Sequence, residues 1–186
     1  LLLILFIVMN IFNNYGINNV YATTNLTLEQ LKSKFPSGKY WNHNGSNNPD
    51  GYTSNPCTHH GNCDYYGNCA CNSYANAIQC MGFAFKLGYD AFGSNPRNWS
   101  TTTSLSTLKA GDIIRYKNDT HSIFVTGVDG DIVTYSDCNS DGHCKIRWNA
   151  TISKSTIRST LTRVYVAPES LKLNNNSDST SINPID

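Results

Sequence analysis

The stretch that decides the fold runs from residue 111 to residue 139 and reads GDIIRYKNDTHSIFVTGVDGDIVTYSDCN. Three runs rich in β-branched and aromatic residues lie within 108–116, 121–128 and 132–139, and polar turn residues separate them. Short connections between runs of strand length are typical of antiparallel neighbours. The stretch therefore predicts a three-stranded meander.

Two side chains with acid–base chemistry fall at the ends of this meander. His121 begins the second strand and Asp137 ends the third, with a turn at 129–130 between them. Because the two strands are expected to run antiparallel, the start of one and the end of the other meet at the same sheet edge. We therefore expect Asp137 to orient the imidazole of His121. Asn139, on the same face by strand periodicity, is the alternative third member.

A cysteine upstream of the meander is the candidate nucleophile. Cys80 is the one left over if the other six of the seven cysteines pair. It lies near the start of 78–88, where apolar residues predict a buried helix that stops at Gly88. A helix N-terminus favours the reactive thiolate, and its N–H groups can help to hold an oxyanion. The order Cys80, His121, Asp137 thus predicts a nucleophile, a base and an orienting acid.

The ordered motifs resemble those of the CHAP family of amidases and peptidases, which is related to the NlpC/P60 enzymes of the papain-like group. The motifs are 79–80, 111–113, His121 and 136–139, and the resemblance covers roughly residues 70 to 150. It implies an α+β, papain-like fold in which the helix that bears the nucleophile packs on a small antiparallel sheet, with loops stapled by disulfides.

The same resemblance implies a function. Cys80 matches the family's nucleophile, His121 its general base and Asp137 its third member. Gln79 matches the glutamine that precedes the nucleophile, and Asn139 a nearby polar position, so these two are the oxyanion or alternative third-member candidates. The expected reaction is hydrolysis of an amide bond in bacterial peptidoglycan, by an endopeptidase or an N-acetylmuramoyl-L-alanine amidase, with no cofactor and no metal.

The residues by themselves indicate only acyl transfer through a thioester. Transfer to water gives a hydrolase, and transfer to an amine gives a transpeptidase or a transglutaminase-like enzyme that uses the same three groups. A different class of function also remains, an exported binding or surface module that disulfides staple and that has no catalysis.

Charge and the ends of the chain bound the location and the partners. The chain has 14 basic and 13 acidic residues, a net charge of +1, which gives no broad footprint for nucleic acid. An apolar run at 1–9 and a possible cleavage site at 20–22 predict a signal peptide over 1–22 whose start is truncated, with an uncleaved N-terminal anchor as the alternative. We therefore expect a secreted protein, extracellular or in the cell wall, with no membrane span in the mature chain, and a monomer.

The rest of the chain divides by composition. Residues 23–70 are expected to contain a helix at 26–35, followed by an irregular region rich in Cys, Asn and Gly. Residues 71–168 are expected to form the catalytic core, with further strands at 145–148 and 161–166. Residues 169–186, rich in Asn and Ser, are expected to form a disordered tail or linker.

Export makes disulfides the default for the six other cysteines. Cys138 and Cys144 are expected to close a small loop. Two bridges are expected among the upstream four, with three pairings open: Cys57, Cys63, Cys69 and Cys71.

The upstream cysteine region also contains His59 and His60. Thiol and imidazole are zinc ligands, but their spacing here fits no standard finger or ribbon, so the disulfide interpretation is preferred. The two histidines are rival candidates for the base, although no acid is positioned behind them in the sequence.

Overall fold

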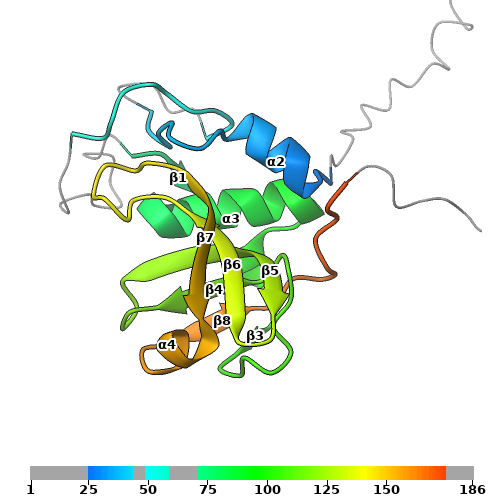
Figure 1. Ribbon diagram of the computed structural model, residues 1–186. Helices are drawn as coiled ribbons and strands as arrows, with labels where there is room; N and C mark the ends of the chain where they lie inside the picture. The colour runs from blue at the N-terminus through cyan, green and yellow to red at the C-terminus, as the bar shows by residue number, and fades with distance from the viewer. Residues whose placement is uncertain (1–24, 44–48, 59–70, 175–186) are drawn as a thin grey trace, which may run out of the picture.

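The structure is a computed structural model that describes residues 25–43, 49–58 and 71–174. The expected signal peptide, His59, His60, Cys63, Cys69 and most of the expected tail lie outside the described residues. The fold is α+β as predicted, with helices packed against an antiparallel sheet (Figure 1). None of the helices in the described ranges combines the length and the apolar character needed to cross a bilayer.

The main sheet has six strands in the order β3-β8-β4-β5-β6-β7, and all of their pairings are antiparallel. The strands are β3 (Thr101–Thr102), β4 (Ile113–Tyr116), β5 (His121–Asp129), β6 (Ile132–Asp137), β7 (Arg147–Ser153) and β8 (Arg163–Tyr165). The predicted meander is confirmed as β4, β5 and β6. The strand predicted at 161–166 is present as β8, which pairs with β4, whereas the one predicted at 145–148 is displaced: β7 begins at Arg147, runs on to Ser153 and pairs with β6.

Two apolar clusters lie on opposite faces of this sheet because strand side chains alternate between faces. Ile113 and Phe124 belong to the cluster that α3 (Gln79–Phe92) covers, whereas Ile114, Ile123 and Val125 belong to the other. The second cluster is closed by Ile157 of the short helix α4 (Lys154–Arg158). Figure 1 shows α3 and α4 at opposite ends of the sheet.

The predicted N-terminal helix is confirmed as α2 (Leu28–Lys34). The Thr27 side chain accepts a hydrogen bond from the backbone N–H of Gln30, and the Gln30 side chain accepts one from the backbone N–H of Thr27, which makes a capping box. Leu28 and Leu31 face the core that α3 also fills, and α2 lies beside α3 in Figure 1. The region before residue 71 thus contributes to the main core.

The helix that carries Cys80 follows a small hairpin of β1 (Ser73–Tyr74) and β2 (Ala77–Ile78). The predicted helix is present, but its predicted stop at Gly88 is wrong. α3 continues to Phe92 and ends at Gly93, which adopts the left-handed conformation with φ of 65°. Gly88 instead allows close packing, since a Cβ at this position would lie 2.8 Å from Pro96 and 2.9 Å from Trp99.

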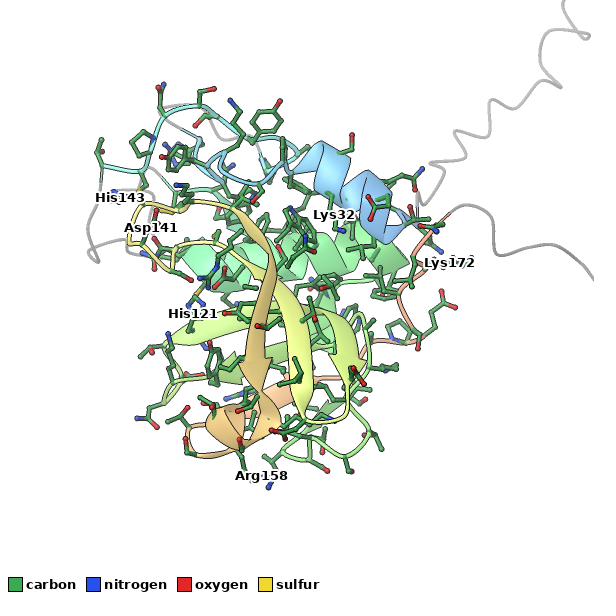
Figure 2. The ribbon with its side chains drawn as sticks, in the orientation of Figure 1. Lys32, His121, Asp141, His143, Arg158 and Lys172 are labelled. Atoms are coloured by element: carbon green, nitrogen blue, oxygen red, sulfur yellow. A yellow bond between two sulfur atoms is a disulfide. The ribbon has the colours of Figure 1, made fainter. Side chains whose placement is uncertain are left out.

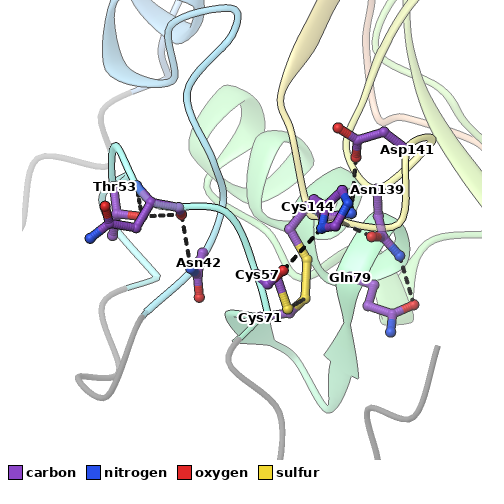
Figure 3. Close-up of a disulfide and its surroundings, with 10 residues drawn as sticks. Asn42, Thr53, Cys57, Cys71, Gln79, Asn139, Asp141 and Cys144 are labelled. Atoms are coloured by element: carbon purple, nitrogen blue, oxygen red, sulfur yellow. Dashed lines mark hydrogen bonds between the residues drawn. A yellow bond between two sulfur atoms is a disulfide. The ribbon is translucent and has the colours of Figure 1, made fainter. Parts of the chain in front are cut away.

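The disulfide expectations are partly wrong. Cys144 is bonded to Cys71, not to Cys138, so Cys71 is also not paired within the upstream group. Cys138 is a buried, unbonded thiol, so Cys80 is not the one cysteine left over. The physical reason is that Cys138 points into the main core, whereas Cys144 lies in a separate cluster with Cys57 and Cys71 (Figure 3).

The first residues of the expected tail belong to the packed domain. Leu171 is buried, and its backbone N–H donates to the carbonyl of Ala110. The next residue, Lys172, accepts a hydrogen bond from the backbone N–H of Leu28 at the start of α2. The segment therefore connects the N-terminal helix with the chain just before β4.

The close approach at Gly88 gives a stability prediction. In Gly88→Ala the added methyl meets Pro96, Trp99 and, at 3.1 Å, Ile113. Overpacking of this kind costs about 1–3 kcal/mol, which exceeds the gain in helix propensity of about 1 kcal/mol. We expect a lower free energy of unfolding in urea.

Gly127→Ala is the matched control because a Cβ there makes only an ordinary contact at 3.8 Å with Thr134. An increase in stability of Gly88→Ala would show that the helix does not pack closely at this point.

Candidate active site

Cys80 is the second residue of α3, as the sequence predicts. The side chain of the N-cap residue, Ile78, makes no capping hydrogen bond, so the N-terminal partial charge of the helix is not neutralised by a cap. The thiol is buried, and its sulfur lies 3.9 Å from the carbonyl oxygen of Thr120. The nucleophile candidate is thus held between the start of a helix and the start of β5.

His121 and Asp137 meet as the meander predicts. The Nε2 atom of His121 lies 2.8 Å from Oδ2 of Asp137. The imidazole also lies near enough to the thiol of Cys80 for each group to shift the pKa of the other. In Figure 2, His121 lies near the end of α3 at which that helix begins. The three candidate residues therefore form one chain of contacts.

Burial alone would raise the pKa of Cys80, because a thiolate is poorly solvated there. The hydrogen bond and the charge of His121 outweigh this effect, and the backbone of Ser122 and the charge of Arg115 act in the same direction. The pKa of Cys80 therefore lies below its ordinary value. This is the condition under which a thiol becomes a nucleophile.

The pKa of His121 shifts in the opposite direction to that of Cys80. Burial works to lower the pKa of His121, but the hydrogen bond with Asp137, and then the contact with Cys80, raise that pKa to about 9. For Asp137, burial works to raise the pKa, whereas hydrogen bonds from His121, Arg147 and Ser140 hold it below its usual range. The arrangement favours a thiolate, an imidazolium and a carboxylate in a row.

Two partners of Asp137 were not predicted. Nε of Arg147 lies 3.0 Å from Oδ1 and Nη2 lies 2.9 Å from Oδ2, so the guanidinium binds both carboxylate oxygens. The Ser140 hydroxyl donates a short hydrogen bond to Oδ2. Arg147 pairs directly with Asp137 in the β6–β7 register. The sequence indicates only that Arg147 lies in a strand, the one expected at 145–148.

Asn139 does not contact His121 in the way an alternative third member would. Its Oδ1 accepts a hydrogen bond from the backbone N–H of Cys144 at 3.0 Å, and its Nδ2 donates to Oε1 of Gln79 at 3.0 Å (Figure 3). A backbone N–H can only donate, so these contacts fix which way both side-chain amides face. With Oε1 occupied, the Nε2 group of Gln79 remains as a donor directly before the nucleophile.

The Asn139 network rests on the disulfide, because Cys144 is bonded to Cys71 at the start of the β1–β2 hairpin. Gln79 and Asn139 both adopt the left-handed backbone conformation, with φ of 52° and 68°. Such conformations cost energy in residues with side chains and are common at functional sites.

Two cysteines of the upstream region, Cys57 and Cys71, lie in a group of three sulfurs with Cys144. Sγ atoms of Cys57, Cys71 and Cys144 lie within 4.8 Å of one another, and those of Cys57 and Cys71 are 3.0 Å apart. The Cys71–Cys144 bond uses two of the three sulfurs, and a sulfur in a disulfide is not a thiolate ligand. The rival bases His59 and His60 lie outside the described residues.

No family model matches the chain, and no curated protein matches it. The solved structures that resemble it include Ly7917 and Ly7917 "with the hydrolyzing product of MDP", each 24% identical, with TM-scores of 0.34 and 0.33. In each case 38% of this chain is covered, and the chain spans about a third (32%) of the length of that protein.

The shifts at Cys80 and His121 predict an unusual dependence of stability on pH. The ordinary values are 6.5 for the imidazole and 9.0 for the thiol. Between them, the unfolded chain holds one proton on Cys80, and a folded chain in which Cys80 and His121 form an ion pair holds one on His121. Because the two states bind equal numbers of protons, we expect this pair to leave the free energy of unfolding flat from pH 7 to 8.5.

In Cys80→Ala the unfolded chain loses its proton from His121 above pH 6.5, whereas the folded chain keeps it because Asp137 still raises that pKa. Stability from His121 is therefore fully present below 6.5 and is lost as pH rises, at up to about 1.4 kcal/mol per pH unit. Urea unfolding at several pH values measures this slope. Cys138→Ala, which also removes a buried thiol, should stay flat, and a slope in that variant or none in Cys80→Ala would contradict the ion pair.

Proposed function

We propose that this protein is a secreted cysteine hydrolase that cleaves amide bonds in bacterial peptidoglycan. The observation that carries the proposal is the chain of contacts from the thiol of Cys80 through His121 to the buried carboxylate of Asp137, whose oxygen lies 2.8 Å from the imidazole. A depressed thiol pKa beside an imidazole and an orienting acid is the arrangement of thiol-dependent acyl transfer.

The reaction has two steps in this scheme. The Cys80 thiolate attacks the carbonyl carbon of the scissile amide, and the imidazolium of His121 gives its proton to the departing amine as the C–N bond breaks. The resulting thioester is then attacked by water, whose proton passes to His121, and cleavage of the C–S bond restores the thiolate. Asp137 keeps the ring oriented in both steps.

The oxyanion of each tetrahedral intermediate needs hydrogen-bond donors. The candidates are the backbone N–H groups in the first turn of α3, which begins at Gln79, and the Nε2 group of Gln79. Asn139 acts on this arrangement through Gln79, by occupying the acceptor oxygen of its amide.

The substrate class rests on the resemblance of the ordered motifs to the CHAP family. The papain-like character of the fold and the signal peptide belong to the same proposal. The proposal covers both an endopeptidase and an N-acetylmuramoyl-L-alanine amidase, because both cleave an amide through the same thioester.

The decisive test compares purified wild type with Cys80→Ala in the release of soluble fragments from isolated peptidoglycan. We expect wild type to release fragments and the alanine variant to lose release by at least about a thousandfold, because the nucleophile is removed. Mass spectrometry of the fragments identifies the new ends and hence the bond that is cleaved. Fragments joined to an added amine would instead indicate acyl transfer to amines.

Alkylation by iodoacetamide provides the control on the thiol itself. We expect Cys80 to be labelled below pH 8, where ordinary thiols are mostly protonated. Cys138 should be labelled only after unfolding, because it is fully buried and burial raises its pKa well above the ordinary value. An unreactive Cys80 together with no fragment release would favour a binding module without catalysis.

The orientation of Gln79 gives a separate prediction. In Asn139→Asp both side-chain oxygens are acceptors, so the Gln79 amide must turn its Nε2 toward residue 139 and present Oε1 in place of a donor. We expect kcat to fall by roughly 10²–10³-fold, as for the loss of one oxyanion donor. Labelling of Cys80 by iodoacetamide should persist because alkylation forms no oxyanion.

Gln79→Glu is the matched variant, because it removes the same donor directly. Its loss of kcat should resemble that of Asn139→Asp, and the double variant should lose little more, since both changes remove one group. Full activity in Asn139→Asp would show that the Gln79 amide does not act on the oxyanion.

A further inference from the structure

We propose that Arg147 is a positioning residue that limits the basicity of the catalytic imidazole. It acts through Asp137 and touches neither Cys80 nor the substrate in the proposed reaction. The inference rests on the proposed role of His121, but it concerns the proton affinity of the ring and is tested without a substrate.

The first observation is the number of donors around one buried carboxylate. Asp137 is fully buried, and Oδ2 accepts hydrogen bonds from His121, Ser140 and Arg147, while Oδ1 accepts one from Arg147. The hydrogen bonds with Arg147 are a bidentate, charge-assisted pair, which is the strongest geometry for this couple. The carboxylate therefore has no freedom to rotate away from the imidazole.

The second observation is that Arg147 is itself held in place. Its Nη2 lies 3.1 Å from the hydroxyl of Tyr135, and the guanidinium lies over the ring of Tyr135 at 5.6 Å from the centroid. The same Nη2 donates to the hydroxyl of Ser140 at 2.9 Å. These contacts keep the positive charge of Arg147 beside the carboxylate of Asp137, although 47% of the arginine side chain is exposed.

The consequence follows from what the imidazole has to do. A base that takes a proton from water and later gives it up works best when its pKa lies near the working pH. Asp137 and Cys80 already raise the pKa of His121 to about 9. A buried carboxylate with no other cation would raise it further and hold the ring as an imidazolium. By sharing the charge of Asp137, Arg147 opposes this rise.

The test is an NMR titration of the His121 ring in a Cys80→Ala background, which removes the coupled thiolate. We expect Arg147→Gln to raise the midpoint by about one pH unit, the effect of one nearby charge on a partner group. Lys145→Gln is the matched control, because it removes the same charge two residues away and Lys145 is not among the partners of Asp137. We expect it to leave the midpoint almost unchanged.

A double-mutant cycle with Asp137→Asn tests whether Arg147 affects the pKa of His121 through the carboxylate of Asp137. If Arg147 acts through the carboxylate, Arg147→Gln should shift the midpoint much less when residue 137 is an amide. An equal shift in both backgrounds would mean a direct charge effect and would overturn the positioning role. No rise, or a fall, in the simple Arg147→Gln variant would overturn the inference as a whole.

Arg147→Lys guards against a variant that fails to fold, because it keeps a cation beside the carboxylate. Its midpoint should stay near that of the parent, while with Cys80 present its kcat should fall severalfold with little change in KM, since a single ammonium cannot hold both oxygens. Should wild type cleave no peptidoglycan, the titrations would still decide the role of Arg147, so the two proposals can fail separately.

Discussion

The buried carboxylate of Asp137 is the interaction on which the rest of the site depends. It joins three strands, because it lies on β6, binds His121 of β5 and is bound by Arg147 of β7. A charge with no exposed surface is costly unless it is paired and hydrogen-bonded, and here His121, Ser140 and Arg147 all hydrogen-bond to the carboxylate. The hydrogen bonds that stabilise the buried carboxylate of Asp137 therefore also fix the imidazole of His121 beside the sulfur of Cys80.

The second constraint is the meeting of α3 with the sheet. α3 packs over the sheet face that contains Phe124, and this places Cys80 beside the start of β5. The Cys71–Cys144 disulfide fixes the loop after β6. Within that loop, Asn139 is hydrogen-bonded to the backbone of Cys144 and in turn holds the side-chain amide of Gln79. Nucleophile, base and oxyanion candidate are thus each positioned by a different part of the molecule.

The sequence predicts the parts of this arrangement that depend on local pattern. Alternating runs separated by polar turns predict β4, β5 and β6, and antiparallel pairing then brings His121 and Asp137 together. The sequence does not predict the extent of α3, because a glycine near the end of an apolar run resembles a helix stop, whereas Gly88 allows a close tertiary contact with Pro96. The bidentate contact of Arg147 was also missed, because the register of β6 against β7 depends on a loop whose conformation local pattern does not specify.

The cysteines show most clearly why the rest could not be predicted. Counting and proximity favoured a Cys138–Cys144 bridge, yet neighbours on a strand point to opposite sides, and Cys138 is directed into the apolar core while Asp137 faces the imidazole. Cys80 and Cys138 are both buried, unbonded thiols, but burial raises the pKa of Cys138, whereas His121 reverses the effect of burial at Cys80. Reactivity is therefore decided by the partner that the fold supplies to each thiol, which neither the number of cysteines nor their degree of burial reveals.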